Sequence, residues 1–549
     1  MDQRDKMPKK FIFRRNQIIG AASAESDSNY LNICFVNTGD IDIIKDCTDP
    51  RNILVGRTGS GKSALIIRLA EDEEHVIQIS PESLSLSYIA NSNIISFFTE
   101  AGVKMDIFYR LLWRHIFCVE VLKERFSIDT EAKKQSFLDK LWAMVPKNKQ
   151  HEKALAYLQN WGESFWEETE YRIKEVTTKL ESELKGAVNG KIPETVSLNA
   201  GVSKKLTDEE RTEIIHRAQE VVNRVQIREL SDVIKLIDEV LLDDRQRRYY
   251  ITNDRLDEDW VEESIRYRLI RALIETSVEL SRIVNLKVIV AIRSDLLDRV
   301  YRYTRDSGFQ EEKYQTCSLD ILWNRNQLIE ILDNRIDLLV RDQYTTQRVT
   351  HKDILPTKIG NQPTIDYILE RTLLRPRDVI QFFNMCIKTA DGKTNITIQA
   401  LREAEGNYSR DRLKALLDEW QGLYPNISHY FQLLKGKSTI FQCSDFTEDE
   451  LQENLLQLLA SGKGKPGEDM YQMQLVVDGN KTLIEYRNEL VYIYYRVGLV
   501  GLKVDGTSPF SWSYLSGVSV SSAEIGDSTK IQIHKTFWRV LGVFDRNDV

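Results

Sequence analysis

Short, mostly apolar runs alternate with longer helix-like patterns over the first 300 residues of the chain. The apolar runs, which are typical of strands buried on both faces, lie at 52–55, 76–79, 249–253 and 286–292. Apolar residues recur at the spacing of an amphipathic helix at 64–70, 108–126 and 261–283. This alternation predicts an α/β domain with a parallel sheet and helices on both of its faces.

Two other stretches of the first half carry their own patterns. The apolar stretch at 31–36 has the pattern of a strand. Between about 130 and 245, two long charged helices around a turn at 186–201 predict a helical hairpin inserted in the sheet domain. The charged faces of this hairpin are either solvated or form an arm for self-assembly or for a partner.

The second half of the chain is helical and ends in a mixed pattern. Apolar residues at helical spacing follow position 321 and predict a helical lid. Helices at 445–459 and 483–495 precede two alternating stretches, 498–504 and 510–515, which predict a β-hairpin and hence a winged-helix-like α+β domain. We therefore expect the following organisation: an N-terminal arm at 1–45, a core built on the parallel sheet at 46–340, a helical lid at 341–430 and a winged-helix-like domain at 431–549.

Composition narrows the class of protein. The chain has 549 residues, a net charge of −8, 42% hydrophobic and 29% charged residues, which is typical of a globular protein of several domains. Its six cysteines include no C-x-x-C pair, which disfavours a zinc site or a disulfide framework. No apolar run is long enough to span a bilayer and no signal-peptide pattern is present, so we expect a cytoplasmic protein without a membrane partner.

Residues 56–63 match G-x-x-x-x-G-K-[ST], the phosphate-binding loop of P-loop NTPases, between a predicted strand and a predicted helix. The glycines let backbone N–H groups turn toward a phosphate, and the helix N-terminus adds partial positive charge. Lys62 is predicted to reach the β- and γ-phosphates, and Ser63 to bind Mg²⁺. A glycine-rich loop that matches by chance is the alternative. The predicted ATP-binding residues are Gly56, Arg57, Thr58, Gly59, Ser60, Gly61, Lys62, Ser63 and Ala64.

A second acidic motif follows the apolar run at 249–253. Asp254, at the tip of that predicted strand, is where a Walker B carboxylate would hold Mg²⁺. Asp257 and Glu258 are the carboxylates available to orient water, and the sequence does not choose between them. Arg293 ends the run at 286–292 and either senses the γ-phosphate or pairs with Asp295.

Two further segments are candidates for contact with the nucleotide. Arg375 and Arg377 flank a proline at a predicted helix start. They either reach a phosphate or form ion pairs with Asp378 and Glu370. The segment 18–27 either wraps the nucleotide base or is a packing arm.

Together these motifs resemble a family of bacterial P-loop ATPases near the STAND and KAP branches. The resemblance rests on residues 20–27, 55–63, 249–260, 291–297, 319–335, 375–378 and 533–542. In that family the Walker B strand is usually followed by D-D-L-D, whereas this chain has Asp254-Arg255-Leu256-Asp257. The resemblance implies a cytoplasmic ATPase whose nucleotide state controls assembly or an associated effector, several members being encoded in anti-phage or mobile-element loci.

The sequence thus predicts an Mg²⁺-dependent switch ATPase with Lys62, Asp254, Asp257, Glu258 and Arg293 as its catalytic groups. We expect ATP as ligand and a homo-oligomer, a separate effector protein or both as partners. An ATP-gated scaffold with little hydrolysis is the first alternative, because Arg255 replaces an acidic residue. A DNA-handling ATPase is the second, and it is not favoured because no basic recognition helix stands out.

Overall fold

The structure of the protein, a computed structural model, describes most of the chain outside the predicted insertion. The described residues are 11–81, 105–127, 227–305 without 243, 245 and 259, 312–344, 347–460, 474–515 and 520–544, with single positions at 143, 152, 212 and 216. The predicted helical hairpin lies outside these residues, apart from its last part. No helix of this described part is long and apolar enough to cross a membrane.

The described chain forms two compact units. The sheet unit consists of Gly39–Gly56 and Leu65–Ile321. The helical unit consists of Met1–Thr38, Arg57–Ala64 and Leu322–Val549. The phosphate loop therefore belongs to the helical unit, although it directly follows a strand of the sheet unit.

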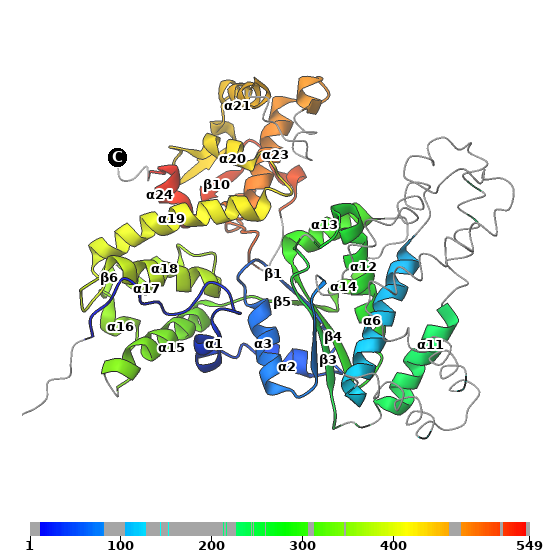
Figure 1. Ribbon diagram of the computed structural model, residues 1–549. Helices are drawn as coiled ribbons and strands as arrows, with labels where there is room; N and C mark the ends of the chain where they lie inside the picture. The colour runs from blue at the N-terminus through cyan, green and yellow to red at the C-terminus, as the bar shows by residue number, and fades with distance from the viewer. Residues whose placement is uncertain are drawn as a thin grey trace, which may run out of the picture. The chain divides into compact units, whose positions relative to one another are not determined.

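The sheet unit is built on five parallel strands in the order β2-β3-β4-β1-β5. The elements of this unit are α2 Asp40–Lys45, β1 Ile53–Gly56, α3 Lys62–Asp72, β2 Val76–Ile79, α6 Asp106–Phe126, α11 Ile227–Leu236, the π-helical turn Ile237–Leu241, β3 Tyr249–Asn253, α12 Glu263–Leu280, β4 Leu286–Arg293, α13 Ser294–Thr304, α14 Glu312–Gln315 and β5 Ser318–Asp320. The four strands predicted from apolar runs are all present, and β5 is an additional short edge strand. Figure 1 shows α2 and α3 on one face of the sheet and α6 and α12 on the other.

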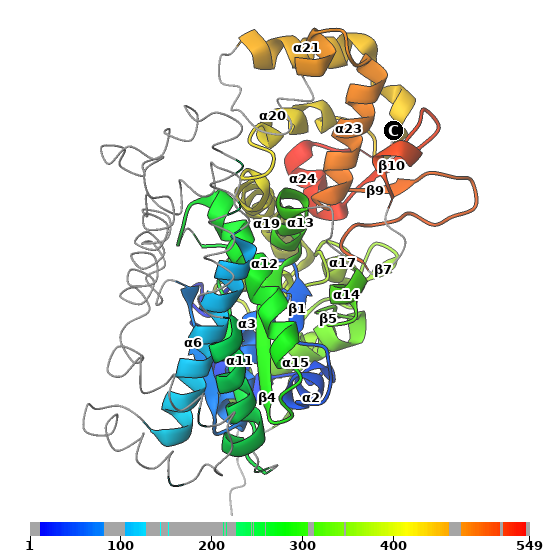
Figure 2. The ribbon, with the colours of Figure 1, turned by 90° about the vertical axis from the view of Figure 1, so that its right-hand side faces the viewer.

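Strand burial explains why these apolar runs became central strands. β3 and all of β4 except Arg293 are buried, as both faces of each strand are covered by helices. In the second view, α6 and α12 again lie together over the strands (Figure 2). Trp113 of α6 fixes this layer, because its indole Nε1 donates to the carbonyl of Leu269 on α12 at 2.9 Å.

The strand order places β4 between β1, which leads into the phosphate loop, and β3, which precedes Asp254. In the β1–β4 register Gly56 lies opposite Arg293. The carboxyl ends of these parallel strands therefore meet at one edge of the sheet, where ligands bind in open α/β sheets. The unit thus has the α/β architecture of a P-loop NTPase.

The helical unit has two hydrophobic cores joined by one long helix, α19 Ile398–Trp420. The Thr397 side chain begins this helix by accepting from the Ala400 N–H. The elements before α19 are α1 Ser28–Cys34, α15 Arg325–Tyr344, α16 His351–Ile354, the strand pair β6 Lys358–Ile359 and β7 Gln362–Pro363, α17 Thr364–Leu369 and α18 Pro376–Thr389. Within this unit, Figure 1 shows α15, α17 and α18 on one side of α19 and the following elements on the other.

We call residues 421–544 the C-terminal module. Its elements are α20 Ile427–Tyr430, β8 Ile440–Gln442, α21 Glu448–Ala460, α23 Leu483–Arg496, β9 Val500–Lys503, β10 Lys530–Ile533 and α24 Trp538–Leu541, with 3-10 turns at Phe431–Leu434, Cys443–Asp445, Ser522–Glu524 and Lys535–Phe537. The two predicted helices of this region are present. Its small sheet has the antiparallel order β8-β10-β9.

The predicted hairpin between 498–504 and 510–515 is wrong. Only one antiparallel bridge, between Leu502 and Ser511, joins the two stretches, and β9 pairs along its other edge with β10. In the register of that bridge the partner of Val504 is Pro509, which has no N–H to donate. Trp512 lies against Gly501, where an added Cβ would meet the indole at 2.6 Å. Pairing therefore stops after one bridge.

The strand predicted at 31–36 is also wrong, because most of this stretch forms α1. Leu31 and Cys34 are buried whereas Ile33 is 66% exposed, so burial follows helical spacing rather than strand alternation. α1 packs against α15. The domain boundaries, the lid and the winged-helix assignment stay predictions.

Buried His534 makes the stability of the helical unit depend on pH. Its Nε2 lies 2.9 Å from the Tyr514 hydroxyl, and burial lowers the pKa of His534 from 6.5 to about 3. The unfolded chain therefore binds a proton below pH 6.5 that the folded chain does not, and stability is lost as pH falls from 6.5 toward 3. We expect the free energy of unfolding to drop by about 1 kcal/mol per pH unit from this group.

Urea unfolding at pH 6.5 and 5.5 measures this loss, and His534→Gln provides the comparison. The variant should lose less stability over this interval, because it lacks the imidazole whose protonation opposes folding. Few carboxyl groups titrate between these two pH values, so they add little to the loss in either protein. An equal loss in both proteins would contradict the assignment.

Candidate functional site

The phosphate loop has the backbone conformation that anion binding requires. Gly59 and Gly61 have φ angles of +79° and +104°, which ordinary residues rarely adopt. Such angles turn successive N–H groups toward one side of a loop. α3 begins at Lys62, so the N–H groups of its first turn, including those of Ser63 and Ala64, come directly after the loop.

The carbonyl oxygens of the loop are occupied by side-chain donors. Lys62 Nζ donates to the Arg57 carbonyl at 3.2 Å, Arg375 Nη1 to that of Thr58 at 2.8 Å, and Trp323 Nε1 to that of Ser60 at 2.6 Å. A carbonyl oxygen facing a phosphate would repel it. These hydrogen bonds hold the three oxygens on the protein side of the loop, and the Ser60 N–H also donates to the Arg57 carbonyl, at 3.1 Å.

Two loop hydroxyls support the fit to a polar ligand. Thr58 Oγ1 and Ser60 Oγ are buried and have no hydrogen-bond partner among the described residues. A buried hydroxyl without a partner costs free energy, so an acceptor such as a phosphate oxygen fits here. The loop residues therefore suit a nucleotide phosphate.

Arg375 joins the loop to a buried group of charges. It is 3% exposed and its Nε donates to Asp378 at 3.0 Å, which is the ion pair that the sequence allowed. Arg412 lies 3.4 Å from the same carboxylate, and Glu419 lies 3.8 Å from Arg375. Burial raises the pKa of Asp378, but the two guanidinium groups outweigh it and lower that pKa to about 2. Asp378 is therefore ionised, and the other predicted partner, Glu370, contacts Lys535 instead.

Arg377 lies between the loop and the N-terminal segment 18–27. Its Nε donates to the Ala22 carbonyl at 2.7 Å, and its Cβ would lie 2.7 Å from a Cβ added at Gly59. The segment is also held by Arg335, which donates to Ile19 and pairs with Asp27 at 2.5 Å. The segment packs beside the loop, and its contact with a nucleotide base stays a prediction.

The predicted carboxylates lie in the sheet unit, at the ends of β3 and β4. Asp254 directly follows β3, and its Oδ1 accepts from the Arg255 N–H at 2.8 Å. Arg293 bridges two carboxylates: it pairs with Asp295 through Nε and Nη2, at 2.9 and 3.0 Å, and with Asp257 through Nη1 at 3.0 Å. Its pairing with Asp295, the alternative to a sensor role, is thus present.

Arg255 and Glu258 form a looser pair. Arg255 has a φ of +59°, and its Nε lies 3.9 Å from Glu258 Oε1. Both candidate water-orienting carboxylates, Asp257 and Glu258, therefore have a guanidinium beside them.

The structure thus gathers the predicted residues into two groups. The loop, Arg375 and Arg377 lie together in the helical unit, whereas Asp254, Asp257, Glu258 and Arg293 lie together in the sheet unit. Sequence reasoning missed Arg412 and Glu419, which come from the amphipathic helix α19. The only signal for these two residues in the sequence was that each is charged at a position where the helical spacing of apolar residues predicts burial.

The chain is similar to the following known proteins, among others. The profile of the family described as the FunZ-associated C-terminal helical domain matches residues 326–417, which hold α15 to α19. A putative transposon gamma-delta 80.3 kDa protein of Escherichia coli K12 is 22% identical over 97% of this chain and 68% of its own length. The crystal structure of Cdc6p from Pyrobaculum aerophilum is similar with a TM-score of 0.27 and 10% identity, over 92% of this chain and 94% of that one.

Gly59 provides a direct test of the loop geometry, with Gly392 as its control. Gly392 has nearly the same φ, +76°, but no atom lies within 4 Å of an added Cβ. At either position alanine would have to adopt a left-handed backbone conformation, which costs about 1–2 kcal/mol. We expect Gly59→Ala to abolish nucleotide binding by displacing Arg377, while Gly392→Ala only lowers the melting temperature.

Nucleotide affinity and thermal melting of both variants check this expectation. Equal affinity of the two variants for nucleotide would show that the contact with Arg377 does not shape the loop.

Proposed function

We propose that this chain binds ATP with Mg²⁺ and acts as a switch ATPase. The phosphate loop carries this proposal, because its positive-φ glycines, its bonded carbonyls and Lys62 together form a cradle for phosphate. The strand order supports it, since β4 lies between β1, which leads into the loop, and β3, which Asp254 directly follows.

Each residue of the loop has a defined task in this proposal. The N–H groups of residues 59 and 61–64 hold the β-phosphate, while that of Ser60 donates to the Arg57 carbonyl, and Lys62 neutralises the β- and γ-oxygens. Lys62 is 8% exposed, so its charge acts from a largely desolvated position. Arg377 lies beside Gly59, and we propose that it contacts the nucleotide while Arg375 fixes the loop backbone.

Ser63 and Asp254 are the residues that would hold Mg²⁺, with a hydroxyl and a carboxylate oxygen of the kind this ion prefers. The ion would supply charge neutralisation at the phosphates and orient them. The remaining groups come from the protein: Asp257 or Glu258 orients water, and Arg293 reports the γ-phosphate from the end of β4.

Hydrolysis is expected to be slow. Arg293 already occupies one oxygen of Asp257, and Arg255 lies beside Glu258, so each guanidinium competes with water for its carboxylate. Arg255 itself stands where related ATPases have an acidic residue. The chain therefore suits a switch that holds ATP for long periods, and an ATP-gated scaffold is the limiting case.

We further propose how this switch is used. The resemblance to the STAND and KAP branches supports a helical lid and a winged-helix-like C-terminal module that respond to nucleotide. Assembly of this chain, or control of a separate effector, would be the output, and anti-phage defence is the setting that the resemblance implies.

A DNA-handling ATPase is the second candidate. The name of the Escherichia coli relative connects that protein with a transposon. If this chain handles DNA, hydrolysis should be stimulated by duplex DNA and binding should weaken steeply with salt. Absence of both effects at low salt would exclude a DNA-handling ATPase and leave the switch ATPase as the candidate function.

Lys62→Ala tests the proposed function, with Arg68→Ala as a control. Arg68 lies on the same helix, α3, but its side chain is 33% exposed and pairs with Asp72. Losing a charged hydrogen-bond donor to phosphate should weaken ATP binding about tenfold to a hundredfold. We expect this loss, and loss of hydrolysis, in Lys62→Ala alone, measured by calorimetry and phosphate release. Unchanged ATP binding in Lys62→Ala would contradict the proposal.

Arg255→Asp tests why hydrolysis is slow. Asp tolerates the left-handed conformation of position 255 and restores a carboxylate beside Asp254. We expect kcat for ATP to rise about tenfold to a hundredfold with little change in KM. Arg255→Asn is the control, because it has the same conformational tolerance without the charge. A rate that rises equally in both variants would assign the slow turnover to the guanidinium beside Glu258 alone, and an unchanged rate in both variants would contradict this explanation.

A further inference from the structure

Arg57, the second residue of the phosphate loop, directs its side chain into the C-terminal module. Its Nη2 donates to the Val497 carbonyl at 2.8 Å, at the turn that joins α23 to β9. The side chain is 11% exposed. A loop residue that serves only the phosphate would not need this contact 440 positions along the chain.

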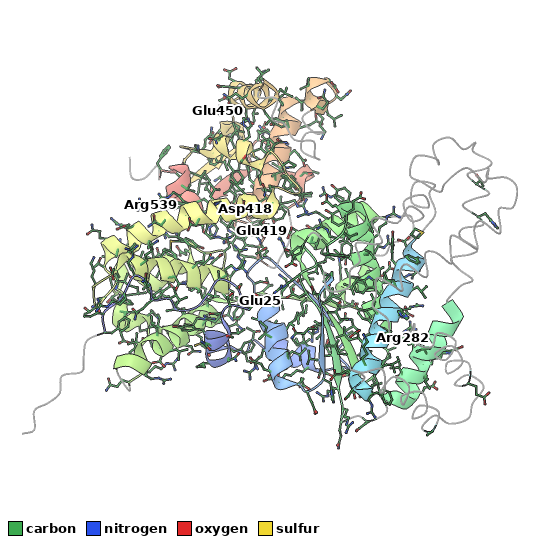
Figure 3. All side chains as sticks on the ribbon, in the orientation of Figure 1. Glu25, Arg282, Asp418, Glu419, Glu450 and Arg539 are labelled. Atoms are coloured by element: carbon green, nitrogen blue, oxygen red, sulfur yellow. The ribbon has the colours of Figure 1, made fainter. Side chains whose placement is uncertain are left out.

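The turn is shaped to receive this guanidinium. Gly498 has a φ of +82°, and a Cβ there would lie 2.5 Å from Arg57 Nη1. Gly498 therefore serves two needs at once: it allows the turn, and it leaves room for Arg57. Glu419 lies near the end of α19 (Figure 3). On another side of Arg57, the Nε atom lies 4.0 Å from Glu419 Oε1.

The environment of Arg57 is costly for a structural contact. Burial lowers the pKa of Arg57 to about 10. Its Nε and Nη1 have no hydrogen-bond partner among the described residues, and Arg375 and Arg412 lie in the same charge group. A methionine would fill a similar space without this cost, because buried ions are often replaced by apolar residues at no loss of stability.

The two ends of Arg57 face different parts of the site. Its carbonyl accepts from Lys62 Nζ and from the Ser60 N–H, at 3.2 and 3.1 Å, within the loop. Its side chain holds the Val497 turn. A change in the position of Lys62 or of the loop backbone therefore acts on the C-terminal module through one residue.

We propose that Arg57 is a positioning residue that couples occupancy of the phosphate loop to the packing of the C-terminal module, through Val497, Gly498 and Glu419. Nucleotide binding holds the phosphate loop in one conformation. The loop then holds the turn at Val497 and Gly498 through the Arg57 side chain. Because coupling is reciprocal, the module also preorganises the loop for nucleotide. This inference rests on the proposed nucleotide binding.

Hydrogen exchange of the full chain, with and without MgATP, tests the coupling. We expect MgATP to slow amide exchange at 497–502 and 530–541 by about fivefold or more, because these segments open less often when the turn is held. In Arg57→Met, ATP still binds through Lys62, with an affinity reduced by about threefold to tenfold, but this protection is lost.

Two further variants separate coupling from simple damage. Arg68→Met removes an arginine from α3 and should keep the full protection. Glu419→Gln keeps the shape of the side chain, removes its charge and should lose part of the protection. Its effect should be smaller in an Arg57→Met background, because the two residues act on one contact.

The outcomes are distinguishable. If the unaltered protein does not bind ATP, the proposed function fails. If it binds ATP without protection at 497–502, or if Arg57→Met keeps that protection, the coupling is wrong and nucleotide binding stands.

Discussion

A phosphate loop must turn its N–H groups outward, and its carbonyl oxygens then need donors from the protein side. In this chain one of those donors is Lys62, and two others come from residues that precede helices of the helical unit. Trp323 precedes α15 and Arg375 precedes α18, and each binds one loop carbonyl. These two hydrogen bonds tie the loop to the starts of both helices. The proposed nucleotide site and the packing of the helical unit therefore share the same hydrogen bonds.

This arrangement buries a group of charged side chains inside the helical unit, where they have little contact with water. Arg57, Arg375 and Arg412 lie around two carboxylates, Asp378 and Glu419. The group is not a source of stability by itself, because desolvation offsets much of the attraction between its members. Three guanidinium groups face two carboxylates, so removal of either carboxylate would leave still more positive charge uncompensated. These ion pairs tie the loop, α18 and α19 to one another.

The sequence predicts this fold well where one physical rule decides. Buried parallel strands need apolar runs, so β1 to β4 were found, and the phosphate loop has a strict spacing. The prediction fails where partners far along the chain decide. The predicted hairpin at 498–515 is reduced to one bridge by Pro509 and Gly501. Whether two strands pair depends on which residues lie opposite each other, and the pattern of one strand alone does not show this. The strand at 31–36 became a helix because its buried face is set by α15.

The candidate site divides in the same way. Lys62, Asp254 and Arg293 follow from motif and strand position, and the bridge from Arg293 to Asp257 depends on the neighbouring strand. The side chain of Arg57 carries no sequence signal, since position two of the motif accepts any residue. Only the turn at Val497 gives it a partner.

Titration of the unaltered protein with ATP, ADP and AMP in the presence of Mg²⁺ measures whether the loop binds a nucleotide through its β-phosphate. ATP and ADP should bind with similar affinity, and AMP, which lacks the β-phosphate, should bind at least about a hundredfold more weakly. Equal affinity for all three nucleotides, or no binding of ATP, would show that the loop does not bind the β-phosphate.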